Sequence, residues 1–297
     1  MRITHGMLSD STLRNLNTTM ERLNQLQDEL TSGQRINAPS DDPIGAAAAV
    51  EFRGTLQQVN QYLKNVDAAN SWMGASDSAL DAITQVLDRA RSLAVQGAND
   101  TLSSSDKQSI ATEVSQLLDQ AIASGNSTYT DQYLFAGFKV GTKPFTLVSG
   151  ASGDTVRYDG DSGQIQRQVD SQSQVTVNVP GGAGTAFDKV FSTLISLRGD
   201  LTSGTSADVS ARIADLDSAL NSVLAARSQI GARMNRLDLQ KNTLQSLQVN
   251  VSGLLSKTQD VDMAQAITEF SVQQNVYQAA LAAGAKAIQP SLLDYLR

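Results

Sequence analysis

The fold is decided by the stretch from Val209 to Leu255, which reads VSARIADLDSALNSVLAARSQIGARMNRLDLQKNTLQSLQVNVSGLL. Apolar residues recur along it at alternating steps of four and three, in a single heptad register that only Arg227, Lys241 and Gln248 interrupt. The pattern predicts one long helix whose narrow apolar seam packs against another helix. The members of the seam are Val209, Ile213, Leu216, Leu220, Val223, Ile230, Met234, Leu237, Leu244, Val251 and Leu255.

Three further helices are predicted nearer the N-terminus. The first has apolar residues at the same spacing and ends near Gly33, which suits the left-handed position after a helix. The second begins at Pro43, a residue favoured in a first turn, and runs for about 55 residues to Gly97, or roughly 80 Å. The third is expected to start with Ser105 as its cap and with Gln108 completing a capping box. The seam of the first helix consists of Leu13, Leu16, Met20, Leu23 and Leu30.

The C-terminal helix carries a seam of the same kind. Asp260 and Asp262 precede it, and we interpret these carboxylates as stabilising the helix N-terminus rather than as catalytic groups. Pro290 ends the helix. The simplest way to bury two narrow terminal seams is to pair them as a coiled coil, and we expect the same residues to form an assembly interface. On this helix they are Met263, Ile267, Phe270, Tyr277, Leu281 and Ile288.

After Gly125 the chain changes character and becomes rich in Gly, Ser, Thr and Val. Short segments in it are rich in β-formers or alternate polar and apolar residues, which is typical of strands. Asp159-Gly160 and Asp161-Ser162-Gly163 predict a hairpin turn between two of them. The predicted strands are Thr128–Thr130, Tyr133–Phe135, Thr155–Tyr158, Gln164–Val169 and Val175–Val179.

These segments together predict a mainly α fold with a small β insert. We expect an elongated antiparallel bundle of long helices, terminal helices paired as a coiled coil, and a central antiparallel β domain. Residues 1–43 with 256–297 would form a terminal-helix domain, and residues 44–138 with 187–255 a long-helix rod with a β-hairpin. Residues 139–186 would form a small outer β domain. Heptads alone also fit an ordinary intramolecular bundle, so that interpretation stays open.

The composition argues against several classes of function. The net charge of −7 and the pI of about 4.7 do not favour a nucleic-acid partner, and no apolar run is long enough to span a bilayer. The chain has no cysteine, and its one histidine, His5, lies close to the N-terminus. Asp154, Asp159 and Asp161 lack the spacing of a calcium-binding loop. We therefore expect no catalytic residues, cofactor or metal, and a structural subunit rather than an enzyme.

Two stretches at opposite ends of the chain resemble the flagellin superfamily. They are LTSGQRINAPSDDP at residues 30–43, and DVDMAQAI at residues 260–267 followed by QPSLLDYL at residues 289–296. The four residues Ser40, Asp41, Asp42 and Pro43, together with the ending at residues 291–296, resemble the branch of the superfamily that joins hook and filament. Flagellins of the filament usually carry a small residue in place of Pro43.

The resemblance implies an extracellular subunit of the bacterial flagellum. It implies export by the flagellar type III apparatus without a cleaved signal peptide, and an export chaperone that holds the C-terminal seam. The subunit would associate with its own copies in the flagellar lattice, between another hook-associated protein on the hook side and flagellin on the filament side. It implies no contact with nucleic acid or membrane. Two alternatives stay open, namely a minor flagellin and a secreted coiled-coil adaptor or translocator.

Overall fold

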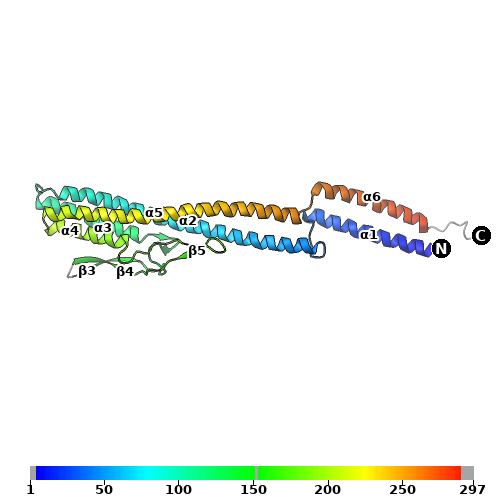
Figure 1. Ribbon diagram of the computed structural model, residues 1–297, viewed down its shortest axis with the longest axis horizontal. Coiled ribbons are helices and arrows are strands. Elements are labelled where there is room, and N and C mark those ends of the chain that lie inside the picture. The colour runs from blue at the N-terminus through cyan, green and yellow to red at the C-terminus, as the bar shows by residue number, and fades with distance from the viewer. Residues whose placement is uncertain (1–4, 151–152, 289–297) are drawn as a thin grey trace, which may run out of the picture. The chain divides into compact units, whose positions relative to one another are not determined.

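The structure, a computed structural model, describes residues 5–150 and 153–288. It confirms the mainly α fold, with α1 and α6 side by side (Figure 1). Among the described helices, none combines the length and the apolar character needed to cross a membrane. The helices are α1 (His5–Ser32), α2 (Pro43–Gly97), α3 (Ser104–Gly125), α4 (Ala186–Ser203), α5 (Ser206–Gln259) and α6 (Met263–Ile288).

The long helices match the sequence prediction, and one helix start does not. Helix α2 has 55 residues with the predicted ends, and α5 contains the whole heptad register. Helix α3, however, is capped by Ser103, not Ser105, and the capping box is completed by Asp106, not Gln108. The Asp106 carboxylate accepts the backbone N–H of Ser103 at 3.2 Å, and the Ser103 hydroxyl accepts the N–H of Asp106 at 3.2 Å. The shorter side chain of Asp106 therefore completes the capping box, as glutamate or glutamine does in the usual pattern.

The chain packs as two compact units. Unit 1 comprises residues 1–59 and 247–297, and unit 2 comprises residues 60–246. Helices α2 and α5 contribute residues to both units. The finer division into terminal, rod and outer β domains stays a prediction.

Ion pairs join α2 and α5 within unit 2. The first and the last pair are twenty-four residues apart on both helices, so one antiparallel register holds along this length. Arg227 and Lys241, which interrupt the apolar heptads in the sequence, supply three of the four contacts. The interruptions therefore connect the helices across the edge of the seam. The pairs are Asp67–Lys241 at 2.8 Å, Asp77–Arg227 at 2.9 Å, Asp81–Arg227 at 2.7 Å and Arg91–Asp217 at 2.7 Å.

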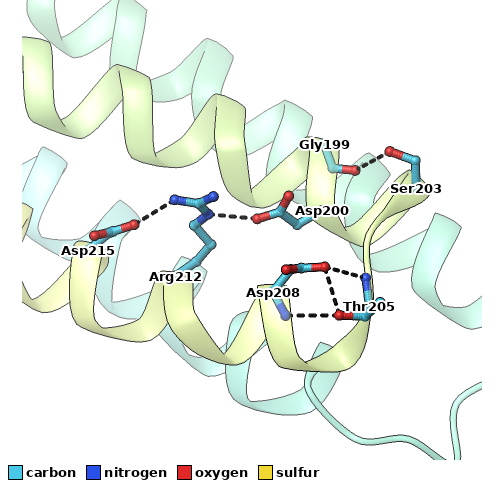
Figure 2. A network of polar contacts seen from close by, with 7 residues as sticks. All are labelled: Gly199, Asp200, Ser203, Thr205, Asp208, Arg212 and Asp215. Carbon is cyan, nitrogen blue, oxygen red and sulfur yellow. Dashed lines mark hydrogen bonds and ion pairs between the residues drawn. The ribbon is translucent and has the colours of Figure 1, made fainter.

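A polar network shapes the turn between α4 and α5 (Figure 2). Thr205 and Asp208 form a capping box: the Thr205 N–H donates to the Asp208 carboxylate at 2.8 Å, and the Asp208 N–H donates to the Thr205 hydroxyl at 3.3 Å. Arg212, one turn later, binds Asp200 of α4 at 2.6 Å and Asp215 of α5 at 2.8 Å. The network caps α5 and connects it to α4, the preceding helix.

In its described residues, the β insert consists of three two-stranded antiparallel sheets rather than the predicted hairpin at Asp159–Gly163. Strand β4 pairs with β3, which the sequence did not predict, and β5 pairs with β6. The Asp161 carboxylate instead accepts the backbone N–H groups of Phe138 at 2.7 Å and Gly163 at 2.8 Å, and so closes a loop. The strands are β1 (Thr128–Tyr129), β2 (Gln132–Tyr133), β3 (Phe145–Gly150), β4 (Gly153–Tyr158), β5 (Gln166–Gln168) and β6 (Gln174–Thr176).

An aromatic cluster anchors this insert to the helices of unit 2. The Phe145 ring at the start of β3 lies 5.0 Å from the rings of both Phe187 and Phe191 of α4. Asn126, at the end of α3, holds the Phe145 backbone by accepting its N–H and donating to its carbonyl, both at 2.9 Å. Phe145 and Phe187 are fully buried, so the insert is part of the core of the unit.

Arg227→Met tests the energetic role of the interhelical pairs. Methionine keeps an apolar stem of similar length but removes both contacts to α2, so we expect the free energy of unfolding to fall by about 1 kcal/mol. Urea denaturation followed by the fluorescence of the sole tryptophan, Trp72, which is buried in unit 2, measures it. The matched control is Arg89→Met, whose partner Glu113 lies across a more exposed contact, with an expected loss below about 0.5 kcal/mol. Equal losses in the two variants would contradict a special role for Arg227.

Candidate assembly surface

The centre of unit 1 is the antiparallel pair of α1 and α6 (Figure 1). At one end of the pair Val261 donates its N–H to the carbonyl of Gly33, and at the other Gly284 lies against Thr12. A Cβ atom at position 284 would lie 3.0 Å from the Thr12 methyl group, so glycine permits a close approach of the two helices here. The apolar side chains that are buried or half-buried along the pair are Leu16, Leu23, Leu26 and Leu30 on α1, and Ala266, Phe270, Tyr277 and Ala280 on α6.

The structure divides the predicted terminal seam into two sets. Five members are half-buried along the pair: Leu16, Leu23, Leu30, Phe270 and Tyr277. Another five are exposed by 45–53%: Leu13, Met20, Met263, Ile267 and Leu281. The side chain of Ile288 lies outside the described residues. The role of all these residues in assembly stays a prediction.

Sequence reasoning missed Leu26 and Ala266, two apolar residues that are buried in the pair. Leu26 lies three residues after Leu23 and four before Leu30, so the alternating spacing could have found it. The sequence interpretation instead extended the heptad from Met20, which places the polar residue Gln27 in the seam. Ala266 carried no signal because a single alanine does not distinguish a buried helix position from an exposed one.

The linker after α1 is tied to the turn between α5 and α6. Gly33 has φ +71°, as predicted for the residue that follows a helix. Gln34 and Asp260 form an antiparallel bridge, and the Arg35 N–H donates to the Gln259 carbonyl at 2.7 Å. These bonds fasten together the ends of α1 and α5 and the start of α6.

The signature residues Ser40 to Pro43 shape the entry to α2. The Asp41 carboxylate accepts the backbone N–H groups of Ala38 at 2.8 Å and Asn37 at 3.0 Å. The neighbouring carboxylate, Asp42, accepts the Gly45 N–H at 2.9 Å and so caps α2, whose first residue is Pro43. The bonds from Ala38 and Asn37 stabilise the charged form and hold the pKa of Asp41 below its ordinary value of 3.8.

A groove of about 510 Å³ opens on one side of the helix pair, against this linker. Asp262 caps α6 beside it by accepting the N–H groups of Ala264 at 3.0 Å and Gln265 at 3.2 Å. Arg35 and Asp42 both line the groove and lie 3.6 Å apart. Within the described residues, no cluster of His, Cys, Asp or Glu side chains is suited to hold a metal ion. The charged lining residues are Arg22, Glu29, Arg35, Asp41, Asp42, Asp260, Asp262 and Glu269.

The other side of the pair carries no charge. Residues turn by about 100° along a helix, so the groove residues Arg22, Gln25 and Glu29 mark one flank of the α1 seam. The exposed stripe through Leu13 and Met20 lies on the opposite flank, about 80° round the helix from the seam. The same rotation on α6 places Gln265 and Glu269 on the groove side. The exposed apolar residues Met263, Ile267 and Leu281 lie on the other side. We call this second side the charge-free face: Leu13, Met20 and Gln27 of α1, with Met263, Ile267, Gln274 and Leu281 of α6.

The charge-free face is suited to contact protein. Of the charged residues of α1, Arg14, Glu21, Arg22 and Glu29 lie at helical positions turned away from it, whereas Asp10 and Asp28 lie at its outer edge, about 80° round the helix from Met20. Among the residues that the structure describes, thirteen of the nineteen exposed large apolar side chains belong to unit 1, although unit 2 is the longer unit. Loss of charge and enrichment in exposed apolar groups mark the core of protein–protein interfaces.

Comparison with known proteins agrees with the resemblance of the two terminal stretches to the flagellin superfamily. The model of the bacterial flagellin N-terminal helical region matches residues 3–139, and that of the C-terminal helical region matches residues 213–296. The chain is similar to a flagellar filament 30.7 kDa core protein of Treponema maltophilum, with 30% identity over 97% of this chain and 96% of the relative.

A second relative and a solved structure are hook-associated or junction proteins rather than filament proteins. Flagellar hook-associated protein 3 of Escherichia coli is 26% identical, over 94% of each chain. The crystal structure of the flagellar junction protein FlgL from Legionella pneumophila superposes with a TM-score of 0.57 and 18% identity, covering 73% of this chain and all of that one. This structural likeness supports the fold.

Protonation of Asp41 should loosen the turn at residues 37–41. The pKa of Asp41 is lowered in the folded chain, so its stabilising effect is complete above pH 3.8 and is lost as the pH falls through the lower folded value. An NMR titration of the Ala38 amide should therefore show its midpoint below pH 3.8. The control Asp41→Asn keeps an acceptor oxygen but should abolish this titration. A midpoint at or above 3.8 in the unsubstituted chain would contradict the assignment.

Proposed function

The chain belongs to the bacterial flagellin family, and within that family we propose that it is a junction subunit, joining the flagellar hook to the flagellin filament. In this role it is a structural protein of the flagellum. It assembles through the helix pair of unit 1 and contacts a hook-associated protein on the hook side and flagellin on the filament side.

The observation that carries the assembly function is the charge-free face. Its five apolar side chains are each about half exposed, and burying the remainder would contribute about 1 kcal/mol for each residue. No partner that carries charges at these positions could cover the face without desolvating them, which is costly. A neighbouring helix pair with apolar side chains meets the requirement.

Two observations bear on the position in the flagellum. Hook-associated protein 3 of Escherichia coli matches over 94% of its own length and the filament core protein of Treponema maltophilum over 96% of its own, so the extent of the match fits both positions. The junction position is supported by the start of α2, where Asp42 caps the helix and Pro43 is its first residue. This pair belongs to the signature that resembles the junction branch.

The same proposal includes the route by which the subunit reaches its place. We expect export through the flagellar type III apparatus and a chaperone that covers the C-terminal helix before assembly. Helix α6 suits such protection, because it exposes the apolar side chains Met263, Ile267, Val272, Val276 and Leu281. Uncovered, these groups would favour aggregation.

A filament-forming flagellin is the second candidate. The 30% identity to a filament core protein of Treponema maltophilum favours it. The two candidates predict different growth: a flagellin adds to its own copies without limit, whereas a junction subunit forms a limited layer between two unlike neighbours.

Electron microscopy of the gold-labelled chain, incubated with sheared hooks and filaments, separates the two. We expect a labelled layer that binds an end and then stops growing. Growth into long labelled filaments would establish the flagellin function instead. Failure of the folded chain to bind either end would contradict both.

Ile267→Glu tests whether the charge-free face forms the interface. It places a charge in the middle of the face, so we expect the labelled layer at filament ends to fall at least tenfold while circular dichroism of the variant stays unchanged. Phe270 is unsuitable for this test because it is half-buried between α1 and α6. The matched control is Val148→Glu, which adds the same charge at an exposed apolar position of β3 and should bind normally. Normal binding by Ile267→Glu would refute the assignment.

A further inference from the structure

Strand β4 has a free edge. Among the described strands it pairs with β3 alone. The N–H of Asp159 donates to the carbonyl of Pro144 at 2.8 Å, and the side to which the backbone groups point alternates from residue to residue along a strand. The backbone groups of Asp154, Val156 and Tyr158 therefore point away from β3. Within the described residues, neither the N–H nor the C=O of Val156 has a hydrogen-bond partner.

A second groove, of about 400 Å³, runs along this free edge, and we call it the β4 groove. Strand β3 packs on α3 and β4 packs on α4. Of β3 only Phe145 reaches the groove, which therefore lies on the side of β4 that faces away from β3. The opposite wall is a flank of α4 formed by Asp188, Ser192 and Ser196. Apolar side chains that line the groove include Phe145, Val156, Phe191 and Ile195.

The free edge and the groove together fit an extended peptide. A strand laid beside β4 would bond to the N–H and C=O of Val156, whereas a compact apolar molecule would cover these groups and leave them unpaired, which is costly. The side chains of Asp154, Val156 and Tyr158 are half-buried and alternate with exposed ones. Because residues directly opposite one another share a face of the sheet, every second side chain of the peptide would enter the groove.

Charge restricts which peptide fits. The described lining of the β4 groove includes two carboxylates, Asp154 and Asp188, and no lysine or arginine. Asp154 is already paired with Arg198 at 2.6 Å. Asp188 accepts the N–H of Gly184 at 3.0 Å and has no ion pair within the described residues. Since Arg198 lies ten residues after Asp188 on α4, Asp188 belongs to the other end of the groove, where a cationic side chain of the peptide would meet it.

We propose that the β4 groove binds an extended segment of another protein, which adds as a strand to the free edge of β4. The segment places an apolar side chain opposite Val156 and a lysine or arginine two residues away, beside Asp188. A second copy of this chain fits less well, because the residues two positions from Val156 on β4 are Asp154 and Tyr158, and neither is a cation. This binding site goes beyond the junction function and does not depend on it.

Amide hydrogen exchange of the full purified chain, measured by NMR, tests the proposal with the synthetic peptide acetyl-TKTVTKT-amide. Lysine on both sides of the valine lets the peptide serve either strand direction. We expect saturating peptide to slow exchange of the Val156 N–H at least tenfold, and to leave the Arg157 N–H, which faces β3, unchanged. Absence of binding at millimolar peptide, or binding without a change at Val156, would overturn the proposal. Protection of Val156 in the concentrated chain alone would assign the edge to a second copy and overturn it as well.

N-methylated peptides provide the matched control for strand addition. One carries a methyl group on the valine nitrogen, and the other carries it on the nitrogen of the threonine that follows. Successive amides of a strand point to opposite sides, so one methyl group should weaken binding at least tenfold and the other less than twofold, whichever direction the peptide runs. Equal losses for the two peptides would contradict pairing along β4.

Asp188→Asn tests the cationic part of the proposal. Asparagine keeps an acceptor oxygen for the N–H of Gly184 but removes the charge, so we expect the lysine peptide to bind at least threefold more weakly. A peptide with threonine in place of both lysines should bind the variant and the unsubstituted chain equally. The matched control is Asp119→Asn, an exposed position of α3 outside the groove, which should bind the lysine peptide normally. Normal binding of the lysine peptide by Asp188→Asn would refute the assignment of a cationic partner residue.

Discussion

The contact between α1 and α6 determines what the rest of unit 1 presents to its surroundings. Its seam is one narrow stripe on each helix, with Gly284 against Thr12 at one end and the linker bonds of Gly33 and Val261 at the other. A stripe of this width leaves the flanks of both helices uncovered. Because the flank that forms the charge-free face is apolar, the pair is stable in water only at the cost of exposed apolar surface. Under the proposed function, assembly would remove that surface from water, so the same sequence would specify the pair and its need for neighbours.

In unit 2 the sequence must specify the register in which the two long helices, α2 and α5, pack. An apolar repeat of seven residues looks nearly the same after a slip of seven, so hydrophobic packing alone does not select one alignment of α2 with α5. The pairs from Asp67–Lys241 to Arg91–Asp217 are unevenly spaced along the helices and fit one alignment. Charges that contribute little stability as surface pairs can thus contribute specificity.

Much of this architecture follows from the sequence, for identifiable reasons. Long periodic helices with Pro43 at a start and Gly33 after an end are determined by local chemistry, and both are confirmed. The hairpin predicted at Asp159–Gly163 was wrong, because Asp161 binds the distant Phe138 N–H and β3 supplies the partner of β4. The terminal seam was predicted as one set, whereas Leu26 and Ala266 define the buried stripe and Met20 and Ile267 lie outside it. Both failures concern tertiary partners, which periodicity does not encode.

Methionine oxidation tests the central claim, that the charge-free face is buried in the assembled flagellum. Met20 and Met263 lie on this face and are 48% and 45% exposed, whereas Met73 in the core of unit 2 is fully buried and serves as an internal reference. Mass spectrometry after brief peroxide treatment compares the free chain with the chain bound at filament ends. The account predicts that oxidation of Met20 and Met263 falls to the level of Met73 on assembly. Oxidation of both at the rate found in the free chain would contradict it.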